Sequence, residues 1–202
     1  MAVKTAKTVK TLETRKEQIH QAACRLFHQQ GFHGTSVRDI AQEVGILGGS
    51  LYTHIVSKDD LLWEIVNAVA DRFVDRIQEI AASDLGVMQK LRAAVIAHVE
   101  EITRDIDAAA VFAIEWRHLS PRRRKAFTAR RNDYEAIFRG MVDQAMRERF
   151  IASNDPSSAA LFILSALNWV FTWYRHDGRM TPTEVGRMLA DFIFDGLKRR
   201  TA

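Results

Sequence analysis

The sequence predicts an all-α protein, because helical signals recur along its 202 residues and no segment has the alternating pattern of a β-strand. Hydrophobic residues make up 47% of the chain, which is enough to build a packed core. Each of the three prolines follows a residue that caps helices well, so we expect each proline at the first position of a helix. These pairs are Ser120–Pro121, Asp155–Pro156 and Thr181–Pro182.

Local signals place the helices in order along the chain. The first helix is expected to begin after Thr14, which has the spacing of a capping box with Glu17, and to end near Gly31. A short second helix ends at Gly45, a third segment covers about residues 49–55, and a long fourth helix begins after Ser57. The apolar spacing predicts further helices at about 86–104, 108–118, 121–150, 156–176 and 182–198.

Residues 35–55 have the pattern of two short helices joined by a tight turn. Ile40 and Ala41 face inward on the first helix, Gly45 provides the backbone freedom of the turn, and Leu51 anchors the second helix. The other side chains of the second helix are small or form hydrogen bonds, which suits a helix lying in the major groove of DNA. The candidate DNA-binding residues are Thr35, Ser36, Arg38, Gly48, Gly49, Ser50, Tyr52, Thr53, His54 and Lys58.

The distribution of charge fits a nucleic-acid partner. The formal net charge is +4, and no acidic residue comes before Glu13, so the N-terminal arm is basic. The cations of this arm are Lys4, Lys7, Lys10, Arg15 and Lys16. A second basic cluster is either solvated surface or a binding site for phosphates, and contains Arg117, His118, Arg122, Arg123, Arg124, Lys125, Arg130 and Arg131.

Composition and missing motifs exclude other classes of protein. Cys24 is the only cysteine, which excludes an internal disulfide and fits a reducing cytoplasm. No apolar run approaches the ~20 residues of a membrane span, so we expect no membrane partner. The chain has no phosphate loop, nucleophile elbow or dinucleotide fingerprint, and its seven histidines show no metal-ligand spacing. We therefore expect a cytoplasmic DNA-binding protein with no metal and no cofactor, and not a small helical enzyme or a protein-binding adaptor.

Five motifs in the N-terminal third of the chain carry a resemblance. They are Gly31-Phe32-His33-Gly34-Thr35-Ser36, Arg38-Asp39-Ile40-Ala41, Gly45-Ile46, Gly49-Ser50-Leu51-Tyr52-Thr53-His54 and Ser57-Lys58-Asp59-Asp60-Leu61-Leu62. With them, residues 14–65 resemble the TetR (tetracycline repressor) family. Leu47 departs from the family's usual Ser or Thr cap, and Ile55-Val56 replaces an aromatic and a polar residue. The docking mode is therefore expected to carry over, but the DNA sequence recognised is not.

The resemblance implies nine helices in two domains. A DNA-binding domain of three helices with a helix-turn-helix is expected at residues 1–57, and a six-helix bundle that dimerises and binds an effector at residues 58–202. The resemblance also implies a transcriptional repressor that binds a palindromic operator as a homodimer and is released when a small-molecule effector moves the fourth helix. A ligand can drive such a change only through different affinities for the two dimer states.

The last two predicted helices are the expected dimer surface, because small and apolar residues share a face on each of them. The residues assigned to this interface are Ala160, Ile163, Leu164, Leu167, Val185, Met188, Leu189 and Phe192.

The aromatic residues of the C-terminal half indicate a cavity between helices. The segments 168–178 and 184–197 resemble TetR members that sense acyl-coenzyme A thioesters and regulate lipid or aromatic-acid breakdown, and such a ligand needs cations for its phosphates. The candidate ligand-binding residues are Phe112, Trp116, Arg117, Tyr134, Phe138, Trp169, Trp173 and Arg175. The sequence leaves open a hydrophobic drug-like effector in a regulator of efflux, or no small molecule at all.

Overall fold

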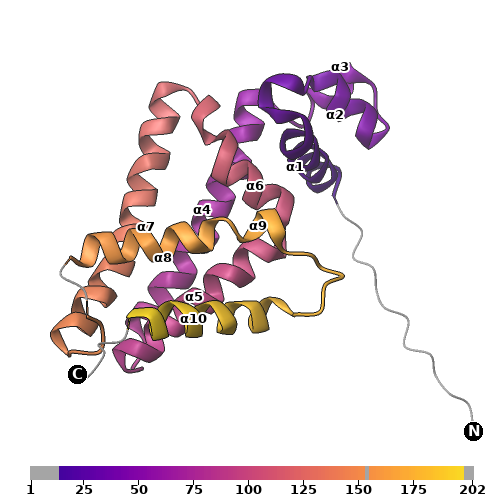
Figure 1. Ribbon diagram of the computed structural model, residues 1–202. Helices are drawn as coiled ribbons and strands as arrows, with labels where there is room; N and C mark the ends of the chain where they lie inside the picture. The colour runs from indigo at the N-terminus through magenta and orange to yellow at the C-terminus, as the bar shows by residue number, and fades with distance from the viewer. Residues whose placement is uncertain (1–13, 153–154, 198–202) are drawn as a thin grey trace, which may run out of the picture.

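The computed structural model describes residues 14–152 and 155–197, and within them it confirms an all-α protein (Figure 1). Ten α-helices and one short 3-10 helix follow one another in this part of the chain, as a small N-terminal group beside a larger bundle. Lys4, Lys7 and Lys10 of the basic arm lie outside the described residues.

Capping side chains and one glycine define the helices of the N-terminal group. The predicted capping box is present: the Glu17 N–H donates to Thr14 Oγ1 at 3.2 Å, and the Thr14 N–H donates to the Glu17 carboxylate at 2.6 Å. Gly45 ends the second helix in the left-handed region, with φ of 73°, as the predicted turn requires. The first helix is interrupted at Gly31, where its end was predicted, because this residue has a non-helical φ of 76°; a further helical segment beyond this kink extends α1 to Gly34. The helices are α1 (Arg15–Gly34), α2 (Val37–Val44) and α3 (Gly48–Leu51).

The larger bundle follows the predicted order, and each proline begins a helix as expected. The predicted helix at 108–118 ends as a 3-10 turn, and the one at 156–176 is interrupted at Trp169. If the two parts around Trp169 are counted as one helix, the described α-helices number the nine that the resemblance implies. The elements are α4 (Lys58–Ala82), α5 (Val87–Arg104), α6 (Ile106–Ile114), η1 (Glu115–His118), α7 (Pro121–Arg147), α8 (Pro156–Asn168), α9 (Val170–Trp173) and α10 (Pro182–Leu197).

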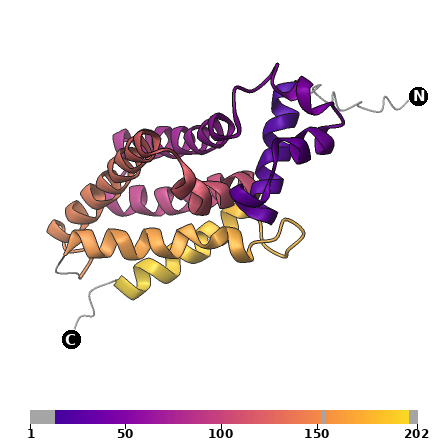
Figure 2. The ribbon, with the colours of Figure 1, turned by 90° about the horizontal axis from the view of Figure 1, so that it is seen from above.

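Helix α5 lies at the centre of the bundle, with α4, α7 and α10 packed against it. Helix α7 also packs against α4 and α8, and α1 packs on α6 and so joins the N-terminal group to the bundle. The view from above shows this group at one end of the molecule (Figure 2). One apolar core runs through both parts, from Phe27 in α1 through Leu62 in α4 to Phe138 in α7. The boundary between residues 57 and 58 stays a prediction.

Helices α5 and α10 approach so closely at Gly186 that no side chain larger than the glycine hydrogen fits at this position. A Cβ atom built on Gly186 of α10 would lie 2.8 Å from Ile96 Cα of α5. A Cβ built on the exposed Gly140 of α7 would meet nothing within 4 Å.

Gly186→Ala is therefore expected to lower the free energy of unfolding by about 1–3 kcal/mol, because overpacking forces the two backbones apart. Gly140→Ala is the matched control and should leave stability unchanged or raise it by up to about 1 kcal/mol, since alanine favours the helix. Urea unfolding followed by circular dichroism measures both variants. Equal stability of the Gly186 variant and the parent would contradict the close packing.

Candidate nucleic-acid interface and ligand cavity

The turn between α2 and α3 presents a polar segment, residues 48–54, on a small apolar support. Ile40, Ala41, Leu51 and Ile55 are buried beneath it. Most of the predicted DNA-binding residues are exposed, namely Ser36, Arg38, Gly49, Ser50, Tyr52, Thr53 and His54, and Gly48 is half-buried. The geometry therefore places an open polar surface where the sequence predicted a DNA-reading element.

Helix α3 is shorter than expected and ends at Leu51. Leu47 occupies the N-cap position and makes no side-chain capping bond, so the departure noted in the sequence leaves the helix without that support. A turn continues the segment: the His54 N–H donates to the Leu51 carbonyl at 2.9 Å, and Thr53 Oγ1 donates to the Ser50 carbonyl at 2.8 Å. The Thr53 hydroxyl hydrogen is thus already used inside the protein, while its oxygen can still accept.

Two of the predicted DNA contacts are corrected by the structure. Thr35 is buried, and its hydroxyl donates to the Gly31 carbonyl at 3.0 Å. Lys58 Nζ donates to the carbonyls of Phe32 at 2.8 Å and Thr35 at 2.7 Å, and it lies 4.3 Å from the centre of the Phe32 ring. Lys58 therefore holds the C-terminal end of α1 in place and does not reach out to a phosphate.

Two exposed apolar side chains beside the reading segment were missed. Leu47 is 81% exposed and Val56 is 83% exposed, so both flank the polar surface in open solvent. Apolar groups in this position can contact the methyl group of thymine. The signal was available in the sequence, because both residues stand at the places where the TetR pattern has polar residues.

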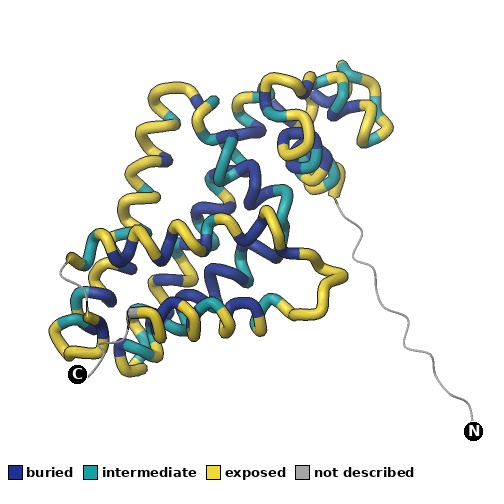
Figure 3. The backbone as a smooth tube through the Cα atoms, in the orientation of Figure 1, coloured by how far each residue is buried: buried dark blue, intermediate teal, exposed yellow. Residues whose placement is uncertain are grey.

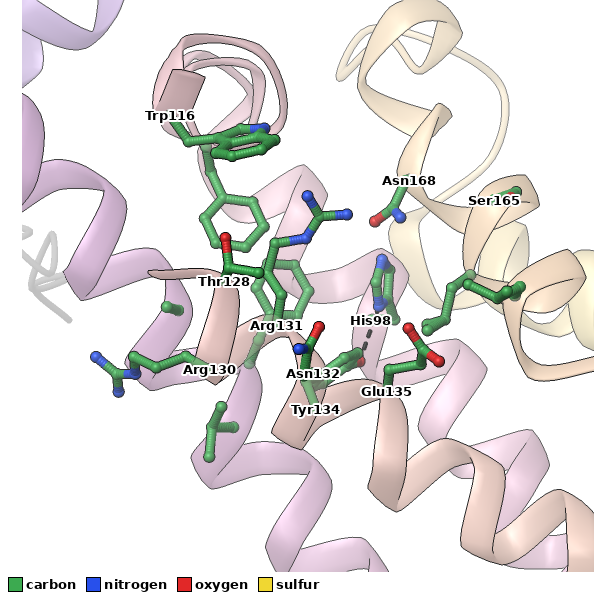
Figure 4. A pocket seen from close by; sticks show the side chains of 16 residues that line it. His98, Trp116, Thr128, Arg130, Arg131, Asn132, Tyr134, Glu135, Ser165 and Asn168 are labelled. Atoms are coloured by element: carbon green, nitrogen blue, oxygen red, sulfur yellow. Dashed lines mark hydrogen bonds between the residues drawn. The ribbon is translucent and has the colours of Figure 1, made fainter. Parts of the chain in front are cut away.

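The bundle encloses a cavity of about 280 Å³ between α4, α5, α7 and α8, here called the main cavity (Figure 4). Phe73, Phe112 and Trp116 supply apolar walls, and Arg131 lies at the same cavity with its guanidinium 5.4 Å from the centre of the Trp116 ring. Of the predicted ligand-binding residues, Phe112, Trp116 and Tyr134 line this cavity.

A buried polar pair lies on the wall of the main cavity. His98 Nδ1 and Tyr134 Oη are 2.8 Å apart, and Asn168 lies beside the other nitrogen of the imidazole (Figure 4). Burial lowers the pKa of His98 to about 3, an effect that the Asn168 amide opposes only in part. Burial raises the pKa of Tyr134, with the Glu101 carboxylate adding to the effect. Both side chains are therefore uncharged near neutral pH. Sequence reasoning missed His98 and Asn168, because nothing local marks them.

A second cavity of about 200 Å³, here called the outer cavity, shares Phe112, Arg131 and Asn168 with the main cavity. Two more predicted residues, Arg117 and Trp169, line it.

The structure does not bring the remaining three predicted ligand residues to either of these cavities. Phe138 is fully buried and packs against the Tyr134 ring, with 5.5 Å between the ring centres. Arg175 lines a separate hollow with His28 and Tyr174, and Trp173 is half exposed to solvent.

The basic cluster divides into cations that hold the fold and cations that are exposed. Arg123 pairs with Asp60, and Arg130 pairs with Asp71, so both connect α7 to α4. The Ser57 hydroxyl, and then Arg123, lower the pKa of Asp60. Arg122 and Arg124 are exposed on the first turn of α7.

A buried carboxyl group joins the main cavity to the N-terminal group. Glu115 of η1 is buried and accepts a hydrogen bond from the Phe32 N–H at 2.9 Å. Its chain neighbour Trp116 forms a wall of the main cavity. Helix η1 therefore contacts both the main cavity and the end of α1.

The predicted dimer residues lie mostly inside the protomer. Ala160, Ile163, Leu167 and Val185 are buried in the core, Leu164 is buried at the wall of the main cavity, and Leu189 is partly buried against the core. The apolar rows read from the sequence are therefore the faces that pack inward, while Met188 and Phe192 are exposed.

Met188 and Phe192 belong, with four residues that were not predicted as dimer contacts, to a set of exposed apolar side chains on α8, α9, α10 and the junction at Trp169, which we call the outer apolar face. Figures 1 and 2 place α8 and α10 on the same side of the bundle, and Figure 3 shows buried and exposed residues interspersed along both helices. The members of this face are Leu161, Phe162, Trp169, Trp173, Met188 and Phe192. Large exposed apolar side chains on neighbouring elements are candidates for an interaction surface.

The described residues contain neither a membrane-spanning helix nor a cluster of metal ligands. No helix there is both long and apolar enough to cross a membrane. No group of three or more His, Cys, Asp and Glu side chains there is placed to hold a metal ion.

Comparison with known families accounts for most of the chain. Residues 19–65 match the family described as bacterial regulatory proteins, tetR family, and residues 84–197 match the tetracyclin repressor-like C-terminal domain. The chain belongs to the TetR family of transcriptional regulators.

Individual relatives agree with this assignment. The HTH-type transcriptional repressor KstR2 of Rhodococcus jostii (strain RHA1) is 30% identical over 185 residues, which cover 91% of each chain. The solved ketosteroid transcriptional regulator KstR2 of Mycobacterium tuberculosis has a TM-score of 0.87 at 24% identity, covering 96% of this chain and 100% of that one, and supports the fold. AibR, solved in complex with isovaleryl coenzyme A and operator DNA, has a TM-score of 0.79 at 26% identity, covering 90% and 98%. The protein is thus a DNA-binding transcriptional repressor, and the prediction that it is not an enzyme is confirmed.

Tyr52→Ala is expected to weaken binding to the DNA upstream of the protein's own gene by about tenfold, the effect of losing one contact in a protein–DNA interface. Tyr52 is 58% exposed, so its removal should not change the fold. Phe150→Ala removes an exposed aromatic ring beyond the end of α7 and is the matched control. Fluorescence anisotropy with labelled DNA measures both. If the Tyr52 variant binds DNA as tightly as the parent protein, residues 48–54 are not the surface that contacts DNA.

Proposed function

We propose that this repressor binds a palindromic operator as a homodimer and is released from it by an acyl-coenzyme A thioester. The observation that supports the effector part is a main cavity with aromatic walls that shares Phe112, Arg131 and Asn168 with an outer cavity lined by two arginines. The three parts of the proposal, DNA binding as a dimer, effector class and release, are supported by different features of the molecule.

The size and lining of the cavities fit the two chemical parts of an acyl-CoA. The main cavity, at about 280 Å³, lies just below the range of roughly 300–1,000 Å³ for ligand pockets, so it suits an acyl group and is too small for the whole molecule. Phe73, Phe112 and Trp116 offer the apolar contact that an acyl chain needs. Arg117 and Arg131 at the outer cavity can form charge-assisted hydrogen bonds to phosphates.

The relatives support the same class of effector. AibR was solved with isovaleryl coenzyme A and operator DNA, and it aligns with nearly the whole of this chain. A fatty acid metabolism regulator protein of Bacillus subtilis is 21% identical over 185 residues. We infer that this chain also responds to a CoA thioester produced in the breakdown of lipids or aromatic acids.

Release from DNA follows from contacts that join the cavity to the reading surface. An acyl group against Trp116 would displace η1, whose Glu115 holds the Phe32 N–H. A ligand near Arg130 and Arg131 would also act on α4 through the Arg130–Asp71 pair. Half-sites on one face of DNA repeat every ~34–36 Å, so a small change in the distance between the two reading surfaces removes one set of contacts.

The outer apolar face is the proposed contact between the two protomers. Its aromatic residues are of the kind that supply most of the binding energy in interfaces. Two-fold pairing through this face would match a palindromic operator.

Arg131→Ala is expected to raise the octanoyl-CoA concentration that releases half of the DNA by about tenfold, because a charge-assisted hydrogen bond is lost. Arg122→Ala, which removes an exposed arginine from the same helix away from both cavities, should leave that concentration unchanged. DNA binding is followed by fluorescence anisotropy during titration with octanoyl-CoA. If octanoyl-CoA does not release the parent protein, or if both variants respond alike, the proposed phosphate site is wrong.

Phe192→Glu is expected to weaken the dimer by about 30-fold or more, the effect of losing a contact of about 2 kcal/mol at the centre of an interface. Phe192 is 80% exposed in the protomer, so the change should not affect its fold. Analytical ultracentrifugation over a range of concentrations measures the dissociation constant, with Phe150→Glu as the control. If the Phe192 variant has the same dimer dissociation constant as the parent protein, the outer apolar face is not the contact between protomers.

A further inference from the structure

The imidazole of His98 has one nitrogen with a partner and one without. Nδ1 is 2.8 Å from Tyr134 Oη, while Nε2 has no partner with hydrogen-bond geometry, although the residue is only 4% exposed and the nearby Asn168 amide still acts on the imidazole pKa. Figure 4 shows Nε2 pointing away from Tyr134 toward Asn168, which lies beside it without an aligned hydrogen bond. A polar atom buried in this way is normally satisfied, and its position at a cavity wall points to a group that enters the cavity.

Counting donors decides which nitrogen carries the hydrogen. Burial keeps the Tyr134 phenol protonated, so its O–H must donate to an acceptor. If the phenol donates to His98 Nδ1, only the Nε2–H remains without a partner. If Nδ1–H instead donates to the phenol oxygen, both the Tyr134 O–H and Nε2 remain unsatisfied. The first arrangement leaves fewer buried polar groups unpaired, and it makes Nε2–H a neutral donor.

A neutral N–H donor favours a different chemical group of the ligand from the one that charged arginines favour. Phe73 lies against the His98 ring at 4.8 Å between centres, and burial opposes any charge on the imidazole. The Nε2–H therefore suits an uncharged oxygen, such as a carbonyl, whereas the charged phosphates suit Arg117 and Arg131.

The position of this donor corresponds to one part of an acyl-CoA. His98 lines the main cavity, and Asn168 lines both the main and the outer cavity, so the pair lies where the acyl part joins the CoA part. We propose that His98 Nε2–H, with the Asn168 amide beside it, binds the thioester carbonyl oxygen of the effector. This inference rests on the proposed acyl-CoA response and assigns the residue that recognises the thioester itself.

Two CoA compounds that differ only in the carbonyl group test the proposal. Octanoyl-CoA carries the thioester carbonyl, and S-octyl-CoA is the thioether without it. Isothermal titration calorimetry with the full chain should show that the parent binds octanoyl-CoA about 3- to 10-fold more tightly than S-octyl-CoA, as one neutral hydrogen bond implies. His98→Phe, which keeps the ring shape and removes the donor, should abolish that preference and leave the affinity for S-octyl-CoA within about twofold of the parent.

Two further variants separate recognition from packing. His98→Gln retains an N–H donor and should recover part of the preference for octanoyl-CoA. Tyr134→Phe removes the O–H that fixes the imidazole hydrogen on Nε2, and it should reduce the preference even if His98→Phe does not fold. Thermal unfolding and DNA affinity without ligand check that each variant is folded.

The outcomes distinguish this inference from the function on which it rests. If octanoyl-CoA and S-octyl-CoA bind the parent equally and both release DNA, the acyl-CoA response stands and the His98 proposal is overturned, because Asn168 then satisfies Nε2 within the protein. If His98→Phe weakens both compounds equally, the role of His98 is packing and the proposal is also overturned. If neither compound binds the parent, the acyl-CoA response fails and the His98 proposal fails with it.

Discussion

The structure depends on the buried hydrogen bond between the Glu115 carboxyl group and the Phe32 N–H. A carboxyl group in an apolar interior is costly unless it is paired, so this contact holds η1 in one orientation against α1. His118 adds to it, with Nε2 at 3.6 Å from Glu115, and Lys58 holds the Phe32 and Thr35 carbonyls on the other side. The N-terminal group and the cavity wall are thereby parts of one packed unit. A regulator needs such a connection, because coupling between two sites requires an element that both of them contact.

The polar groups around the cavities differ in how they are buried. His98 and Tyr134 are kept neutral by burial at the wall of the main cavity, whereas Arg131 lines both cavities and Arg117 lines the outer one. Arg123 and Arg130, which look the same in the sequence, are used to attach α7 to α4. One basic cluster thus contains arginines that connect two helices and arginines that line the cavities, and only the partners of each arginine distinguish them.

Exposed apolar side chains occur at both functional ends of the molecule. Leu47 and Val56 flank the polar reading segment, where their removal from water would come with DNA contact. The outer apolar face of α8, α9 and α10 is larger and includes aromatic rings, as expected for a contact between proteins. These side chains are exposed in the protomer, although Leu161 and Trp169 also line the two cavities.

Most of the helices, the turn between α2 and α3 and the family could be predicted from the sequence, because these depend on signals within a few residues of one another. The Thr14–Glu17 capping box, the prolines at helix starts and the left-handed Gly45 are of this kind. The packing of distant segments was needed to show which apolar row of α8 and α10 faces inward and that His98 lies against Tyr134 and beside Asn168. Helix α8 is apolar on several faces, so its periodicity could not choose between the core and a partner. The pairs Arg130–Asp71 and Glu115–Phe32 join residues far apart in the chain, and no local pattern encodes such contacts.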